Sequence, residues 1–161
     1  MKKIAFCALC ISISALFGCS NEAGSAAMSS DSLVRTSVQL DESELSQAVG
    51  SSFSRKYDLD DGHGITFRDG EGPVFSIEHR ANRTNIAWEV YSSADGSFDA
   101  MNAENALWAK KALSHALGEA HAQEVLASIK NQQPTKLDAF GHEVRVMPGS
   151  MQNLVTVHNR K

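Results

Sequence analysis

The sequence predicts an α+β domain, in which an antiparallel sheet of about five to six strands packs against one or two helices. Three features support this prediction: a meander of alternating segments, a long segment rich in alanine and leucine, and a C-terminal hairpin. The chain has 161 residues, of which 42% are hydrophobic and 21% charged. These values suit one globular domain, which is expected to cover residues 33–161.

The first half of the domain is predicted to hold a strand, a helix and the meander. Apolar and polar residues alternate over 33–40, which indicates a half-buried strand. Asp41 and Glu44 resemble a helix-capping pair, and apolar residues at helical spacing follow, so a helix is expected over 42–53. Further alternating segments with short polar connections predict the three strands of the meander: 64–68, 74–80 and 84–91.

The second half is predicted to hold helix and then a hairpin. Residues 99–131 contain no proline and one glycine, so we expect one long helix or two helices with a bend near Gly118. Two strands are expected at 140–147 and 151–158. Pro148–Gly149 between them suits the central positions of a type II turn.

The N-terminus has the organisation of an export signal. Lys2 and Lys3 precede an uncharged apolar run over 4–17, which is shorter than the ~20 residues that a membrane-spanning helix needs. The run leads into the tetrapeptide Leu-Phe-Gly-Cys at 16–19, after which the sequence becomes polar. Residues 1–18 are therefore predicted to be a signal peptide.

The tetrapeptide at 16–19 resembles the lipobox of bacterial lipoproteins, which has an aliphatic residue three positions before the cysteine and a small residue directly before it. This resemblance implies that Cys19 becomes the acylated N-terminus, which anchors the chain in the lipid bilayer. Ser20 is similar to the outer-membrane sorting pattern, which implies an envelope location facing the periplasm. The alternative is an ordinary secretory signal that is cut elsewhere, such as after Ala26–Ala27.

The mature chain is expected to be acidic and free of disulfides. The signal peptide contains two of the three cysteines, and lipidation would use Cys19. Loss of the two lysines with the signal peptide changes the formal net charge from -4 to -6, which argues against a nucleic-acid partner. Residues 19–32, rich in serine and alanine, predict a flexible tether behind the lipid.

No motif for catalysis, cofactor binding or metal binding is present in the sequence. The acidic segment 58–64 lacks the ligand spacing of an EF-hand and is interpreted as a solvated loop. His115 and His121 are six residues apart, so they point away from each other on a helix. Three histidines on predicted strands would hold a metal only by converging in the sheet: His79, His142 and His158. We therefore predict no cofactor and no metal ligands.

Trp108 is the candidate partner-binding residue. It lies about 140° from Leu113 on a helical wheel, off the main apolar stripe, although a broad buried helix face also explains it. The leading hypothesis is a non-catalytic envelope lipoprotein that binds a protein partner, as an assembly or accessory factor or as an inhibitor or immunity protein. The alternatives are a small periplasmic hydrolase that uses histidine and carboxylate residues, and a periplasmic ligand-binding module.

Overall fold

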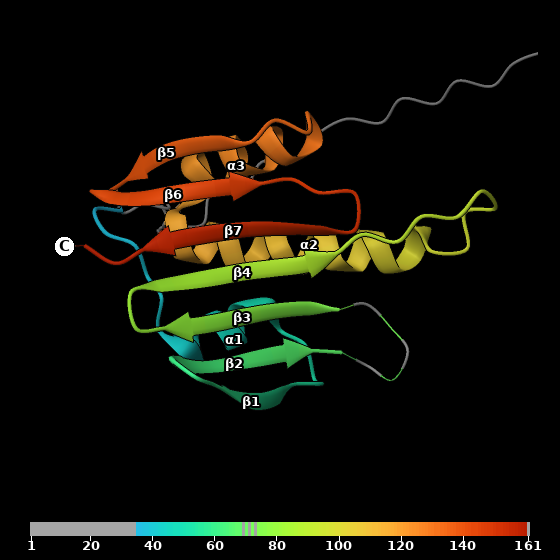
Figure 1. Ribbon diagram of the computed structural model, residues 1–161, viewed down its shortest axis with the longest axis horizontal. Helices are drawn as coiled ribbons and strands as arrows, with labels where there is room; N and C mark the ends of the chain where they lie inside the picture. The colour runs from blue at the N-terminus through green and yellow to red at the C-terminus, as the bar shows by residue number, and fades with distance from the viewer. Residues whose placement is uncertain (1–34, 69, 71, 73, 161) are drawn as a thin grey trace, which may run out of the picture. The chain divides into compact units, whose positions relative to one another are not determined.

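A computed structural model describes residues 35–68, 70, 72 and 74–160, so the predicted signal peptide, Cys19 and tether lie outside the described residues. Three helices and seven strands follow one another along the described chain (Figure 1). The helices are α1 (Glu42–Val49), α2 (Asp99–Leu117) and α3 (Glu119–Lys130). The strands are β1 (Arg55–Leu59), β2 (Gly62–Phe67), β3 (Phe75–Arg80), β4 (Arg83–Glu89), β5 (Thr135–Ala139), β6 (His142–Met147) and β7 (Gln152–His158).

The seven strands form one antiparallel sheet in the order β1-β2-β3-β4-β7-β6-β5. Strands β1 to β4 make one meander, β5 to β7 make a second, and pairing of β4 with β7 joins the two. The helices all lie on one side of the sheet (Figure 1). Helix α2 contacts β3 and β4, and α3 contacts β5 and β6. The predicted α+β class is confirmed, with seven strands in place of the expected five to six.

The core lies between the sheet and the helices. Successive residues of a strand point to opposite faces, so each strand contributes every second residue to this layer. Ile77 and Ile86 lie opposite each other on β3 and β4 and are fully buried. Leu113 of α2 and Val125 of α3 contribute from the helical side. The other face of the sheet has no helix over it in the part of the chain that the structure describes.

The helix ends follow local chemistry. Asp41 accepts a hydrogen bond from the backbone N–H of Glu44 at 3.0 Å, as the capping pair predicts. Gly50 then adopts a left-handed conformation with φ 69°, which ends α1 earlier than the expected helix over 42–53. The expected break near Gly118 is confirmed, since this residue separates α2 from α3.

The strand predicted at 33–40 is wrong over its described part, which has no strand partner. The Gln39 N–H donates to the Ala116 carbonyl at 2.9 Å, and the Arg35 guanidinium donates to the last carbonyls of α2. Leu40 packs against the core. The alternation of this segment therefore reflects one-sided packing beside α2, and no sheet ladder.

The two additional strands, β1 and β5, are the edges of the sheet. Strand β1 carries charged residues that suppress the apolar alternation used for prediction, as edge strands often do. Strand β5 turns into β6 through Phe140 and Gly141, whose φ angles of 54° and 80° suit a two-residue type I′ turn. Phe140 is therefore outside the strand expected at 140–147. Gly149 does not have positive φ, so the type II turn is also wrong.

Candidate functional site

The uncovered face of the sheet carries one continuous row of residues that crosses all seven strands. Strand register places these residues side by side, and we call them the cross-sheet row: Tyr57, Gly64, Glu78, Asn85, Thr156, Arg145 and Lys136. At about 4.8 Å between neighbouring strands, the row is about 29 Å long. Each half of the chain supplies part of it, so only the β4–β7 pairing brings the row together.

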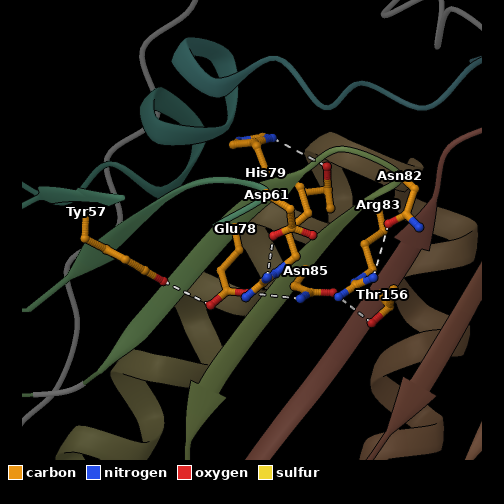
Figure 2. A network of polar contacts seen from close by, with 10 residues as sticks. Tyr57, Asp61, Glu78, His79, Asn82, Arg83, Asn85 and Thr156 are labelled. Atoms are coloured by element: carbon orange, nitrogen blue, oxygen red, sulfur yellow. Dashed lines mark hydrogen bonds and ion pairs between the residues drawn. The ribbon is translucent and has the colours of Figure 1, made fainter. Parts of the chain in front are cut away.

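Hydrogen bonds connect the row across four of its strands (Figure 2). The Tyr57 hydroxyl donates to Glu78 Oε1 at 3.2 Å, and the Asn85 amide donates to Glu78 Oε2 at 3.0 Å. Thr156 Oγ1 donates to Asn85 Oδ1 at 3.0 Å. A carboxylate only accepts hydrogen bonds, so its position fixes the orientation of the Asn85 amide and then that of the Thr156 hydroxyl.

Glu78 is the ionised centre of this network. Arg80 Nε donates to Glu78 Oε2 at 3.0 Å, and Arg80 also donates to Asp61 Oδ1 at 2.6 Å. Burial raises the pKa of the Glu78 carboxyl, but the hydrogen bonds from Asn85 and Arg80 and the charge of Arg80 outweigh it, so the pKa lies below its ordinary value. Burial and the nearby Glu78 charge raise the pKa of Tyr57. Near neutral pH the Glu78 carboxylate therefore accepts the hydrogen bond that the Tyr57 phenol donates.

Gly64 is the gap in the row that lets Tyr57 reach Glu78. The two residues are paired in register on β1 and β2, and a Cβ at Gly64 would overlap the end of the Tyr57 ring. The absent side chain lets the ring lie across β2 to the next strand. Glycine is thus required here for close approach, and its backbone does not have positive φ.

Beside the row, a shallow hollow of about 320 Å³ lies over β4, β7 and β6. We call it the arginine–methionine hollow, after its lining residues Arg83, Asn85, Arg145, Met147, Leu154, Thr156 and His158. Two arginines and a histidine line it with no acidic residue, while Met147 and Leu154 supply an apolar side. The hollow therefore combines positive charge with apolar surface.

A second hollow of about 460 Å³ adjoins the first at Arg145 and His158. Here His158 Nε2 lies 3.8 Å from Glu143 Oε1, and Arg145 Nε donates to the same carboxylate. The hydrogen bond from Arg145 lowers the pKa of Glu143, against a smaller opposing effect of burial. His158 Nε2 is itself buried without a hydrogen-bond partner among the described residues. The second hollow thus brings a histidine, His158, close to a carboxylate, Glu143, as the hydrolase hypothesis requires.

The structure buries Trp108. Its exposed fraction is 6%, and its ring packs edge-on against Phe75 with ring centroids 6.4 Å apart. The exposure that made it a candidate anchor is therefore absent, and the alternative of a broad buried helix face is correct. Trp108 also borders a separate hollow that includes Phe53.

The strand histidines do not converge. His79 and His142 belong to the helix-facing side of β3 and β6, whereas His158 lies on the uncovered face of β7. His79 instead stacks near His63 at a ring-centroid distance of 5.4 Å, and His63 contacts the carboxylate of Glu42 on α1. Within residues 35–160, as far as they are described, no group of three histidine, cysteine or acidic residues is arranged to hold a metal ion.

The residues 58–64, expected to form a solvated loop, mostly belong to strands. Asp58 lies in β1, and Asp61 is in the two-residue turn to β2, where it pairs with Arg80. The signal that sequence reasoning missed is the set of polar residues on alternate positions of β3, β4, β6 and β7. These positions lie side by side only because the strand order places β7 between β4 and β6.

No protein-family model, no curated protein and no solved structure matches this chain. Among the helices of the described residues, none has the length and apolar character needed to cross a membrane. Cys19, the predicted lipidation site, lies outside the described residues.

Proposed function

We propose that this chain is a non-catalytic lipoprotein of the bacterial cell envelope that binds a protein partner through the uncovered face of its sheet. The lipobox at 16–19 supports an acyl anchor on Cys19, and Ser20 supports the outer membrane with the domain facing the periplasm. The role is that of an assembly or accessory factor, or of an inhibitor or immunity protein.

Exposed methionines on the β6–β7 hairpin are the observation that supports this function most directly. Across the described residues, four large apolar side chains are strongly exposed, and two of them flank this one turn. Met147 is 46% exposed and Met151 is 79% exposed, with the half-buried Leu154 nearby on β7. Methionine side chains adapt to irregular surfaces and are common where proteins bind other proteins.

The cross-sheet row gives this surface a fixed shape. Its hydrogen bonds hold polar side chains in place before a partner arrives, which reduces the conformational entropy lost on binding. With strands about 20 Å long, the uncovered face has an area on the order of 600 Å². That is close to the ~800 Å² that each protein contributes to a standard interface.

The hydrolase alternative also has a specific observation in its favour, which is the pair of His158 and Glu143 in the larger hollow. Their separation of 3.8 Å exceeds hydrogen-bond length, and Glu143 already accepts a hydrogen bond from Arg145. The nearby Thr156 hydroxyl donates to Asn85, so it has no adjacent base to activate it. Catalysis there needs rearrangement, whereas binding needs none.

Site-specific photo-crosslinking in cells tests the binding function. A photoreactive amino acid replaces Met147 or Leu154 on the uncovered face, and matched variants carry it at Leu107 on α2 or Glu124 on α3, which are exposed on the helical side. We expect one protein adduct from both face positions and none from either helix position. Adducts from the helices alone, or from no position, would refute binding through this face.

A complementation assay with His158→Ala separates binding from hydrolysis. Because His158 also lines the arginine–methionine hollow, the binding function expects complementation by a folded variant to change only together with crosslinking from Met147 and Leu154. Loss of complementation by a folded His158→Ala chain, with crosslinking from Met147 and Leu154 retained, favours the hydrolase.

The proposed anchor has its own test in Cys19→Ser. Without the cysteine thiol no diacylglycerol is attached, so we expect fatty-acid labelling to disappear and the uncut precursor to accumulate. Intact-mass measurement of the wild-type protein supplies the control, with Cys19 as the acylated first residue. An unmodified mature N-terminus at any other residue contradicts the prediction.

A further inference from the structure

The arginine–methionine hollow has arginine N–H groups on its polar side that are open to a ligand. Arg83 donates to Asn82 Oδ1 at 3.1 Å and has no carboxylate partner among the described residues. Arg145 contacts Glu143 through Nε, while its two terminal Nη groups donate no hydrogen bond within the described part of the chain. Because arginine binds carboxylates through such paired N–H groups, the polar side of the hollow suits an acidic group.

The apolar side of the hollow lies at a fixed distance along the same strands. Met147 is two residues beyond Arg145 on β6, and Leu154 is two residues before Thr156 on β7. Two residues of strand extend about 7 Å, and both members of each pair point to the same face. Arg145 is therefore about 7 Å from the apolar pair along the strands, whereas Arg83, in register with His158, is about 14 Å from it.

An extended peptide has the same repeat. Side chains at positions i and i+2 of an extended chain are on one face and about 7 Å apart. An acidic residue followed, after one intervening residue, by an apolar residue would place a carboxylate at Arg145 and an apolar side chain at Met147 and Leu154.

We propose that the arginine–methionine hollow binds an extended segment of the protein partner that carries this acidic-x-apolar pattern. The inference rests on the proposed function and deepens it, because it names the chemistry of the segment that the uncovered face recognises. Positive charge in the hollow selects the carboxylate of the peptide. The geometry of β6 and β7 selects a separation of two residues between the acidic and the apolar side chain.

The test uses the mature chain in detergent micelles, labelled with ¹⁵N, and the probe peptide acetyl-Gly-Glu-Ser-Leu-Gly-amide. We expect amide shifts confined to β4, β6 and β7 in NMR spectra. Replacing Glu by Gln in the peptide, or moving Leu next to Glu, should each weaken binding about tenfold, the factor expected for a charge-assisted contact.

Protein variants locate the contact. Arg145→Gln should weaken binding of the probe about tenfold. The matched variant Arg55→Gln makes the same charge change on the same face, at the β1 edge far from the hollow, and should bind as the wild type does. Met147→Ser should reduce binding of the Leu peptide and leave a peptide with Ser in place of Leu unaffected.

Each outcome separates this proposal from the proposed function. Equal binding of the Glu and Gln peptides, or equal loss from Arg145→Gln and Arg55→Gln, overturns the hollow as an acidic-x-apolar site. If crosslinks still form from Met147 and Leu154 in that case, binding through the face stands. If no crosslinks form while the probe binds as expected, the acidic-x-apolar site is supported and partner binding through the uncovered face is refuted.

Discussion

Glu78 is the residue on which the cross-sheet row depends, because its carboxylate accepts hydrogen bonds from side chains of three strands. Tyr57 comes from β1, Arg80 from β3 and Asn85 from β4. A charged acceptor strengthens each of these bonds relative to a neutral one. The lowered pKa of Glu78 has the same origin, since every donor that favours the ionised form also opposes protonation.

Replacing Glu78 with Gln should destabilise the domain by about 1–3 kcal/mol, because an amide offers one acceptor oxygen in place of two and leaves a donor unpaired. A folded pKa below the ordinary value of 4.5 means that Glu78 contributes stability above that pH and loses it as the pH falls further. Acid should therefore destabilise the wild type more than Glu78→Gln. Urea unfolding at several pH values measures both effects, with Glu124→Gln on the exposed side of α3 as control.

His79 should make the domain less stable below neutral pH. Burial lowers its pKa, and so does the neighbouring His63. A folded pKa below the unfolded value of 6.5 means that stability is complete above that pH and declines as the pH falls toward the folded pKa. His79→Phe keeps a ring but cannot bind a proton. The difference between urea midpoints at about pH 7.5 and about pH 5.5 should shrink in this variant, and an unchanged difference would count against the assignment.

At the scale of elements, Gly118 determines how the two long helices meet. Its φ of 76° and ψ of 159° fall in a region that only glycine adopts readily, so the chain leaves α2 and enters α3 without an intervening loop. The Arg35 guanidinium, which donates to carbonyls at the end of α2, lies over this junction. A side chain at 118 would strain the backbone and meet Arg35 as well.

Gly118→Ala should therefore cost about 1–3 kcal/mol of folding stability, the cost of a non-glycine residue in a rarely occupied backbone region. The thermal unfolding midpoint measures this loss. Glu124→Ala, a substitution within α3 on its exposed side, should change stability by less than about 0.5 kcal/mol. Equal effects of the two variants would show that the junction tolerates a side chain.

Periodicity predicted the elements that have one clearly buried face and missed those that do not. The strands β2, β3, β4, β6 and β7 and the helical pair are predicted because their apolar residues recur at fixed spacing. Strand β1 was missed because an edge strand buries little on either face, and β5 because its alternation is only five residues long. The segment 33–40 shows the converse error, since packing beside a helix also produces alternation.

The candidate site was less predictable than the fold, for a reason that belongs to the whole molecule. Arg83 and Arg145 are far apart in the sequence and become neighbours only through the pairing of β4 with β7 and of β7 with β6. Strand order depends on the complete chain and cannot be predicted from the residue pattern of a short segment. A helical wheel places Trp108 off the apolar stripe because it treats one helix alone. In the fold α2 packs against both α1 and the sheet, so a broader face of the helix is buried.

The fragment from residue 33 onward should fold without metal and without disulfides. It contains no cysteine, and its described residues form a continuous apolar core between the sheet and the helices. We expect a cooperative thermal transition whose midpoint is the same with and without a chelator. A large decrease in the midpoint on chelation would show a structural metal ion.

The pairing of β4 with β7 also sets the order in which the molecule assembles. Every other pair of neighbouring strands is joined by a short connection, whereas Asn85 and Thr156 are about 70 residues apart along the chain. Closing so long a loop costs conformational entropy before the strand contacts form, so we expect this ladder to form last and to limit the rate of folding. Until residues 152–158 arrive, the backbone N–H and C=O groups along one side of β4 are unpaired. Until then the exposed edge of β4 is open to pairing with another chain, and formation of the β4–β7 ladder closes that route to aggregation.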